Sequence, residues 1–137
     1  MILVDTSGLL AATFPDQKKH PECFAILRST YPRILSPFVL AELDYLAHKE
    51  GGVEAELMIL EDVRRGAYEL ATFGVEDVAE ALSTIDKYRD LNVGLADASI
   101  VVLANRRHCT DVLTLDERHF RALRTRRGPF RILPADA

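Results

Sequence analysis

Four acidic residues carry the chemistry that this sequence offers. Asp5 and Asp116 each follow a short apolar run, which is the pattern of a strand buried on both faces. Glu42 and Asp97 lie on predicted helices, at positions turned toward apolar neighbours. In an open α/β sheet, reactive groups collect just beyond the carboxyl ends of the strands. We therefore expect Asp5 and Asp116 to share one rim of a sheet, with the two helical acids nearby.

Both strand-end acids also have a simpler interpretation. Asp is a good N-cap residue, so Asp5 could cap a helix that begins near Gly8, and Asp116 could cap a short helix through Phe120. The sequence alone leaves capping and chemistry open at these two positions.

The helix predicted to begin at Pro37 places Glu42 in its apolar stripe. Successive helical residues turn by ~100°, so Glu42 projects between Phe38 and Leu46. A buried, unpaired carboxylate costs several kcal/mol or gains a proton. Glu42 therefore needs a partner such as an arginine, a ring of donors or a metal ion, unless it lies at the edge of the stripe and reaches water.

Asp97 repeats this misplacement on another predicted helix. It projects between Val101 and Ala104, on the face that we expect to point inward. It also lies in the first turn, where a carboxylate favourably opposes the helix dipole, so a purely structural role is the alternative.

Carboxylates that converge on one point repel one another unless a cation lies among them. An all-oxygen donor set selects hard ions, Mg²⁺ or Mn²⁺, and none of the four histidines shows ligand spacing with these acids. Such an ion lowers the pKa of bound water and stabilises a leaving oxygen, which suits phosphodiester hydrolysis.

The basic residues are concentrated near the carboxyl end of the chain. The stretch 104–131 holds eight arginines and three acidic residues, a net charge of +5, whereas the rest of the chain carries −9. The planar fork of arginine suits phosphate, so this stretch could bind a nucleic-acid backbone without sequence preference. The alternative is a solvated face that balances an acidic partner.

Alternating apolar strands and helical patterns predict the elements that position these residues. We expect strands at 2–4, 34–35, 68–71, 111–114 and 130–133, and helices at 8–14, 20–29, 37–49, 53–65, 75–89, 96–107 and 116–120, with Gly51-Gly52 as a break. This order predicts a single domain over residues 1–137, a three-layer α/β/α sandwich with a central parallel sheet of about five strands.

Composition excludes several classes of protein. Hydrophobic residues make up 48% and charged residues 28%, the balance of a globular domain, and no apolar run approaches the ~18 residues of a membrane span. Asp5 interrupts the opening apolar run, so no signal peptide is expected. Cys23 and Cys109 lack metal or redox spacing, and we expect a cytoplasmic protein.

Four short motifs, in order, resemble the PIN-domain family, and most closely the VapC-type toxin subunits of bacterial and archaeal toxin–antitoxin pairs. The motifs are Ile2-Leu3-Val4-Asp5-Thr6-Ser7, Ser36-Pro37-Phe38-Val39-Leu40-Ala41-Glu42-Leu43-Asp44, Gly94-Leu95-Ala96-Asp97-Ala98 and Leu113-Thr114-Leu115-Asp116-Glu117-Arg118-His119-Phe120. The resemblance runs from Met1 to about Leu133. It implies an Mg²⁺- or Mn²⁺-dependent endoribonuclease that is active as a homodimer and silenced by a cognate antitoxin.

The resemblance also assigns roles to individual residues. It implies that Asp5 and Asp97 bind the metal, and that Glu42 and Asp116 complete the acidic set directly or through water. Ser7 and Thr114 match supporting hydroxyls. The candidates for contacts with the RNA substrate are Arg106, Arg107, Arg118 and Arg121.

Two other functions compete with the nuclease. A phosphatase could use Asp5 as a nucleophile, although such enzymes commonly carry a second Asp where this chain has Ser7. A non-catalytic binding module would use its acids as helix caps and its arginines to dock a protein. The binding module predicts that divalent ions do not change the melting temperature, whereas a site that needs Mg²⁺ to relieve repulsion should melt at a higher temperature with the ion bound. A phospho-aspartate trapped on Asp5 would identify the phosphatase.

Overall fold

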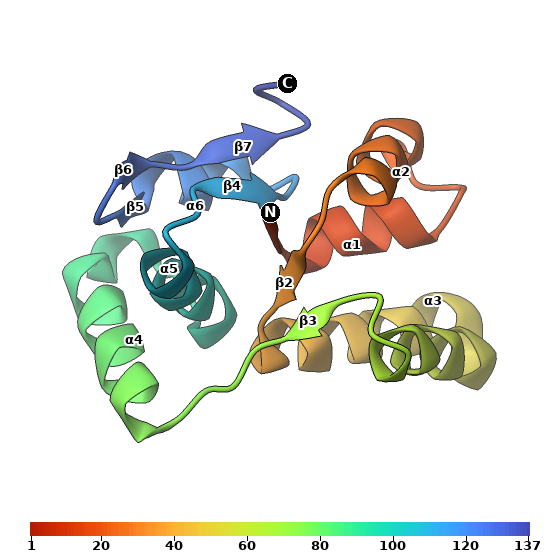
Figure 1. Ribbon diagram of the computed structural model, residues 1–137, viewed down its shortest axis with the longest axis horizontal. Coiled ribbons are helices and arrows are strands. Elements are labelled where there is room, and N and C mark those ends of the chain that lie inside the picture. Colours follow the sequence, from red (N-terminus) through yellow and green to blue (C-terminus); the bar gives the residue numbers. More distant parts are fainter.

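A five-stranded parallel sheet forms the centre of the molecule, as the computed structural model of residues 1–137 shows (Figure 1). The order across the sheet is β3-β2-β1-β4-β7. These strands are β1 (Ile2–Val4), β2 (Arg33–Leu35), β3 (Glu69–Leu70), β4 (Asp111–Leu113) and β7 (Arg131–Leu133). Every neighbouring pair in this sheet is parallel, as predicted from the alternation of strands and helices.

The helices lie in two groups on either side of the strands (Figure 1). One group comprises α1 (Thr6–Thr13), α2 (His20–Ser29) and α3 (Pro37–Arg64). The other comprises α4 (Val75–Lys87), α5 (Leu95–Arg107) and α6 (Glu117–Ala122), with a short 3-10 helix at Arg89–Leu91. Right-handed crossovers explain this division, because the chain moves outward from β1 through β2 to β3 and then returns to β4 on the other side of β1. None of these helices is both long and apolar enough to cross a membrane.

The three-residue strands are stable because both of their faces are covered. Residues Ile2, Leu3 and Val4 are at most 1% exposed and belong to a core cluster of 27 buried residues. The helices contribute mainly small and aliphatic side chains to this core, such as Ala47 of α3 and Ile100 of α5. A continuous apolar strand sequence is what burial on both faces requires.

One local prediction was confirmed and one element was missed. The glycine pair was expected to end one helix before the next begins, and α3 (Pro37–Arg64) does consist of two helical parts joined by a kink at Gly52 (φ 70°, ψ −165°). The two parts fold back on each other, since Nδ1 of His48 lies 3.1 Å from Oε1 of Glu56. Glycine reaches the conformation at the kink without strain. A two-stranded antiparallel hairpin, β5 (Arg124–Thr125) with β6 (Gly128–Pro129), was not predicted, since it has no apolar alternation.

The carboxyl ends of β1 and β4 meet at the switch point of the sheet. The chain leaves β1 for the helices of one layer and leaves β4 for α6 in the other layer. The divergence of the two connections opens a crevice between adjacent strand ends, which is where α/β proteins bind ligands. Asp5 follows β1 and Asp116 lies three residues beyond β4, so the topology brings both acids to this crevice.

Gly8 sets how closely α1 approaches β4. A Cβ atom at this position would lie 2.5 Å from the carbonyl oxygen of Leu113 and 2.7 Å from its carbonyl carbon. The neighbour is backbone at the end of a central strand, which cannot move without disturbing the sheet. The absence of a side chain at Gly8 therefore lets the start of α1 pack directly against the backbone at the end of β4.

We expect Gly8→Ala to lower the free energy of unfolding by roughly 3 kcal/mol, the upper part of the range for overpacking a core. Urea denaturation of the variant measures the effect. Gly74→Ala is the matched control, because its added Cβ would meet no atom within 4 Å and its φ is −106°, so a loss below about 1 kcal/mol is expected. Equal stability of the two variants would contradict the close approach at Gly8.

Candidate active site

Asp5 occupies the N-cap position of α1, but its side chain makes no capping hydrogen bond. The carboxylate is 5% exposed and accepts hydrogen bonds at Oδ2 from the Thr114 hydroxyl (2.6 Å) and the Ser7 hydroxyl (3.2 Å). The capping interpretation therefore does not account for this residue. Asp5 is a buried carboxylate held at the crevice by two hydroxyl groups.

The same two hydroxyls fix the loop that follows β4. Ser7 Oγ accepts a hydrogen bond from the backbone N–H of Leu115 (2.9 Å), and Thr114 Oγ1 accepts one from the N–H of Asp116 (3.0 Å). The two oxygens also lie 3.1 Å apart. The loops after β1 and β4 are thus joined through side chains, and the position of Asp116 depends on the hydroxyl that orients Asp5.

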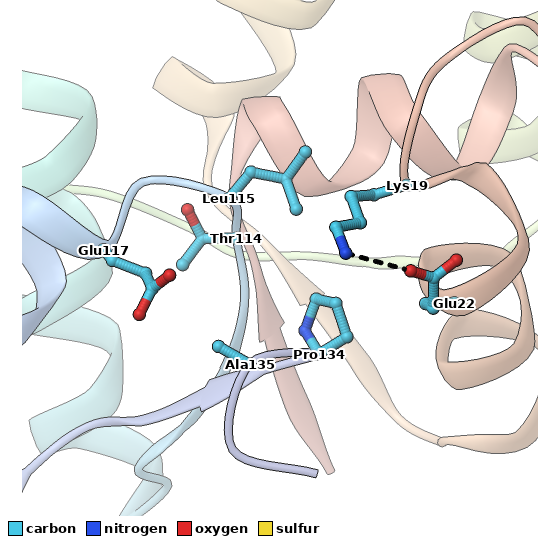
Figure 2. Close-up of a pocket in the computed structure, with 7 residues that line it drawn as sticks. All are labelled: Lys19, Glu22, Thr114, Leu115, Glu117, Pro134 and Ala135. Carbon is cyan, nitrogen blue, oxygen red and sulfur yellow. Dashed lines mark ion pairs between the residues drawn. The ribbon is translucent and has the colours of Figure 1, made fainter.

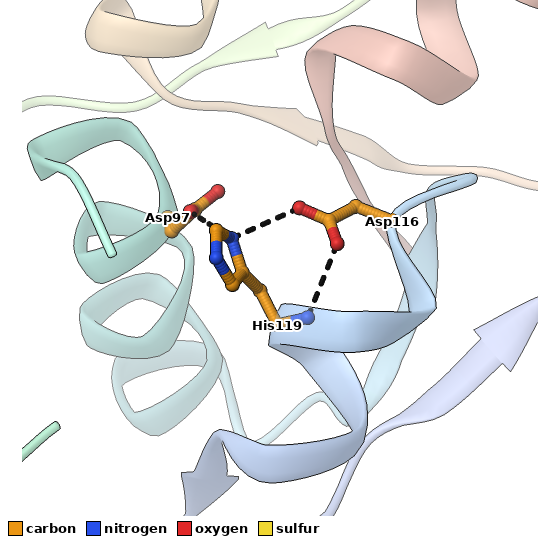
Figure 3. Close-up of side chains that lie close together, drawn as sticks. All are labelled: Asp97, Asp116 and His119. Atoms are coloured by element: carbon orange, nitrogen blue, oxygen red, sulfur yellow. Dashed lines mark hydrogen bonds and ion pairs between the residues drawn. The ribbon is translucent and has the colours of Figure 1, made fainter. Parts of the chain in front are cut away.

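Asp97, Asp116 and His119 form a compact group at the other side of the crevice (Figure 3). Nδ1 of His119 lies 3.0 Å from Oδ2 of Asp97 and 3.0 Å from Oδ2 of Asp116. Asp116 does cap α6, since its Oδ1 accepts from the His119 N–H (3.1 Å). Capping and site formation coexist here, because one carboxylate oxygen serves each purpose.

Glu42 approaches from the first turns of α3. Its Oε1 accepts a hydrogen bond from the Thr6 hydroxyl (2.7 Å), which brings it beside Asp5. The residue is exposed, so the prediction that it lies buried between Phe38 and Leu46 is wrong. The helical projection places the Cβ atom correctly, but a long side chain can carry its charged end out to water.

The charges of the four acids act on one another, with Asp97 at the centre. Burial first, and then the negative charge of Asp97, raise the pKa of Asp5 to about 6, although the bond from Thr114 opposes the shift. Burial also raises the pKa of Asp97, with further contributions from the charges of Asp116 and Glu42, while His119 opposes them. The four acids predicted from the sequence therefore lie close enough to interact electrostatically.

His119 is a member of this group that sequence analysis did not identify. No histidine was expected among the acids, but the ring of His119 lies between two of them and is 21% exposed. Its spacing of three residues from Asp116 was the available signal, since residues i and i+3 share a helix face. The approach to Asp97 comes from tertiary packing and had no sequence signal.

The donor set fits a divalent cation. Asp97, Asp116 and His119 each offer one ligand atom, and these atoms all lie within 4.8 Å of one another. Burial, and after it the charges of neighbouring acids, raise the pKa of Asp5 and of Asp97, and a bound cation would oppose both shifts. Carboxylate oxygens suit Mg²⁺ and Mn²⁺, whereas an imidazole nitrogen is more typical of zinc and other transition metals, so with His119 the donor set is not the all-oxygen one expected from the sequence.

The four predicted substrate arginines lie in different surroundings. Arg106 pairs with Asp77 (2.7 Å) and Arg107 with Glu69, at the end of α5 that lies roughly 14 Å along the helix axis from Asp97.

The other two arginines lie on α6, next to the acids. Arg121 pairs with Glu117 (2.9 Å) and Asp136 (2.7 Å), whereas Arg118 is exposed and makes no ion pair. Arg118 is therefore the member of the set whose charge is free for a phosphate.

Comparison with known proteins gives consistent matches. A family model described as PIN domain matches residues 2–125. Ribonuclease VapC26 of Mycobacterium tuberculosis (strain ATCC 25618 / H37Rv) is 44% identical over 137 residues, covering 97% of this chain and 100% of that protein.

Solved structures show the same fold at low sequence identity. The M. tuberculosis toxin VapC20, described as cleaving the sarcin–ricin loop, superposes with a TM-score of 0.77 at 18% identity, over 85% of this chain and 90% of that one. VapBC2 of Rickettsia felis, bound to a promoter DNA fragment, gives 0.68 at 18% identity, over 96% and 98%. DNA-bound VapBC of Salmonella typhimurium gives 0.64 at 19% identity, over 96% and 95%.

The raised pKa of Asp5 predicts how stability depends on pH when divalent ions are removed with a chelator. The folded protein binds this proton more tightly than the unfolded chain, whose Asp pKa is 3.8, so the free energy of unfolding falls as pH rises from about 4 to about 6. Above about pH 6 the loss in the free energy of unfolding is complete and amounts to about 3 kcal/mol.

Asp5→Asn removes this titration, so we expect the variant to be more stable than the wild type at pH 7.5 and equal to it near pH 4. Urea denaturation across this pH range, with chelator present, measures both proteins. Parallel stability curves for the two proteins would contradict a raised pKa at Asp5.

Proposed function

The chain belongs to the PIN-domain family, as a VapC-type member, and we propose that it is a divalent-metal-dependent endoribonuclease, the toxin component of a toxin–antitoxin pair. The observation that carries the proposal is the gathering of Asp5, Glu42 and Asp116 around Asp97 at the switch point of the sheet. Negative charge concentrated in a crevice is costly without a cation. A bound Mg²⁺ or Mn²⁺ supplies an activated water and stabilises the leaving oxygen.

The side chains of the site have distinct parts in this proposal. Asp5 and Asp97 are the principal ligands, and Glu42 and Asp116 complete the set directly or through water. Ser7 and Thr114 hold Asp5 in one orientation through their hydroxyls, so that it needs no rearrangement on binding the ion.

Hydrolysis joins a water oxygen to phosphorus while the bond from phosphorus to the 3′ oxygen breaks. The products are a 3′-hydroxyl and a 5′-phosphate. Arg118 is exposed on α6, the helix that Asp116 caps, and would contact a neighbouring phosphate of the RNA, which positions the chain without selecting its sequence.

The relatives of the chain support RNA and an antitoxin as its proposed partners. VapC26 is named a ribonuclease and VapC20 a toxin that cleaves the sarcin–ricin loop, which supports RNA as the substrate class here. The structures from R. felis and S. typhimurium are VapBC complexes, which supports a cognate antitoxin. We further propose that the protein acts as a homodimer in the cytoplasm, where its RNA substrate is found.

We expect Asp5→Asn and Asp97→Asn each to lower RNA cleavage roughly 100-fold or more, because each variant removes a charge that holds the cation. The measurement is cleavage of total cellular RNA in Mg²⁺, in Mn²⁺ and in chelator, with the cut ends mapped. Asp90→Asn is the matched control, since Asp90 is exposed and lies outside the site, and it should cleave as the wild type does. Undiminished cleavage by Asp5→Asn in chelator would refute the mechanism.

Divalent ions should also stabilise the fold, independently of any RNA. At an ion concentration 100 times the dissociation constant, binding adds about 2.7 kcal/mol, which raises Tm by several degrees. Asp97→Asn should lose most of this increase, and Asp90→Asn should keep it. A wild-type Tm that does not respond to Mg²⁺ or Mn²⁺ would favour a non-catalytic binding module.

A further inference from the structure

A hollow of about 540 Å³ opens beside the acids, on the side of the crevice that faces α2 (Figure 2). It is formed by three segments that are distant in sequence: the loop after β4, the chain after β7, and the start of α2. This volume lies within the range of small-molecule sites. The four acids do not line it, so the proposed metal chemistry does not account for it.

The hollow and the acidic site share a wall. Thr114 lines the hollow, and its hydroxyl donates to Asp5 (2.6 Å). Leu115, the next residue, also lines the hollow, and its N–H is held by Ser7 (2.9 Å). A group bound in the hollow would therefore lie one side chain away from the carboxylate that is proposed to hold the metal.

The walls suit a flat ring with a polar edge. Leu115 lies across the hollow from Pro134 and Ala135, which gives two apolar surfaces (Figure 2). Charged groups stand at the remaining sides, with Glu117 at one and the Lys19–Glu22 pair at the other. Proteins that read single-stranded RNA cover the faces of an unstacked base, usually with aromatic side chains or arginine, and hydrogen-bond its edge; here aliphatic side chains would cover the faces.

Glu117 makes an ion pair with a neighbour on α6. Its Oε1 accepts from Nη2 of Arg121 (2.9 Å), and Arg121 is held in turn by both carboxylate oxygens of Asp136 (2.8 and 2.7 Å). Oε2 of Glu117 has no partner and Oε1 keeps a second lone pair, so both oxygens can accept a further hydrogen bond, and an ionised carboxylate only accepts. A base that fits must therefore present donors toward Glu117.

Guanine meets this requirement best among the four bases. Its Watson–Crick edge carries two adjacent donors, N1–H and the N2 amino group, which match the two oxygens of a carboxylate. The corresponding edge of uracil carries one N–H between two carbonyl acceptors, which a carboxylate repels. Cytosine and adenine each offer a single amino group.

The ammonium group of Lys19 can bind the phosphate of the same nucleotide. Its ammonium lies 3.3 Å from Glu22, and both side chains are about half exposed, so this ion pair contributes little to stability. Exchange of Glu22 for a phosphate oxygen therefore costs little.

We propose that this hollow is a nucleobase subsite that selects guanine next to the scissile phosphate, an inference that rests on the proposed ribonuclease function. Leu115, Pro134 and Ala135 cover the faces of the base, Glu117 reads its donor edge, and Lys19 contacts its phosphate. Glu117 is then a specificity-determining residue that takes no part in the metal chemistry.

The first experiment measures binding without cleavage. Guanosine 5′-monophosphate and uridine 5′-monophosphate are each titrated into the protein while the methyl resonances of Thr114, Leu115 and Ala135 are followed by NMR. We expect these resonances to shift at a roughly tenfold lower concentration of the guanosine nucleotide. Glu117→Gln should reduce this difference to less than about twofold, and Leu115→Ala should weaken the binding of both nucleotides. Glu50→Gln, an exposed carboxylate on α3, is the matched control.

The second experiment maps cut sites in a pool of RNAs of random sequence. Wild type and Glu50→Gln should show guanine at one position adjacent to the cut, roughly tenfold over uracil. Glu117→Gln should lose the preference at that position alone, with its dependence on Mg²⁺ unchanged.

The two proposals fail in different ways. Equal titration curves for the two nucleotides, or a guanine preference that survives Glu117→Gln, would overturn the subsite even if the RNA is cut. Cleavage that persists in chelator would overturn the metal mechanism. The nucleotide titration would then still decide whether the subsite exists. Titration shifts confined to resonances outside the hollow would likewise overturn the subsite.

Discussion

The buried carboxylate of Asp5 is the constraint on which the rest of the site depends. An ionised group that is 5% exposed is unfavourable in isolation, and its pKa of about 6 expresses that cost. The protein limits the cost with hydroxyl groups from Ser7 and Thr114, which also bind the backbone of the loop after β4. The same hydrogen bonds therefore orient an acid and join two adjacent strand ends. The negative charge that these hydrogen bonds do not neutralise would attract a cation to the site.

The sheet makes this arrangement rigid. The connections from β1 and β4 run to opposite sides of the sheet, so the crevice opens between these two strands. Gly8 lets α1 lie against the backbone at the end of β4, next to this crevice. Asp97 enters this crevice from α5, and Glu42 enters from α3 in the opposite layer. Two carboxylates from the loops after β1 and β4 and two from helices thus lie close enough to interact, beside the buried strands of the sheet. The proposed ion would therefore need little reorganisation of the site, which is the condition for electrostatic catalysis.

The proposed metal site and the proposed base subsite lie at different places in this molecule. The acids and His119 lie on one side of Thr114, and the hollow with Glu117 lies on the other. The loop after β4 serves both, since Asp116 and Glu117 are consecutive residues that point to different sides. In the proposed arrangement, the residues that contact the base are therefore separate from those that hold the ion.

The sequence determined the parallel sheet and the four acids, because both leave local patterns: apolar runs that end in an acid, and acids on the apolar side of a helix. Its helical projection was wrong about the burial of Glu42, since a projection places Cβ atoms and not the ends of long side chains. Tertiary structure alone decided the rest. The contact of His119 with Asp97, the hydroxyl pair on Asp5 and the hollow beside Leu115 join residues from separate segments, and no local pattern records which segments will meet.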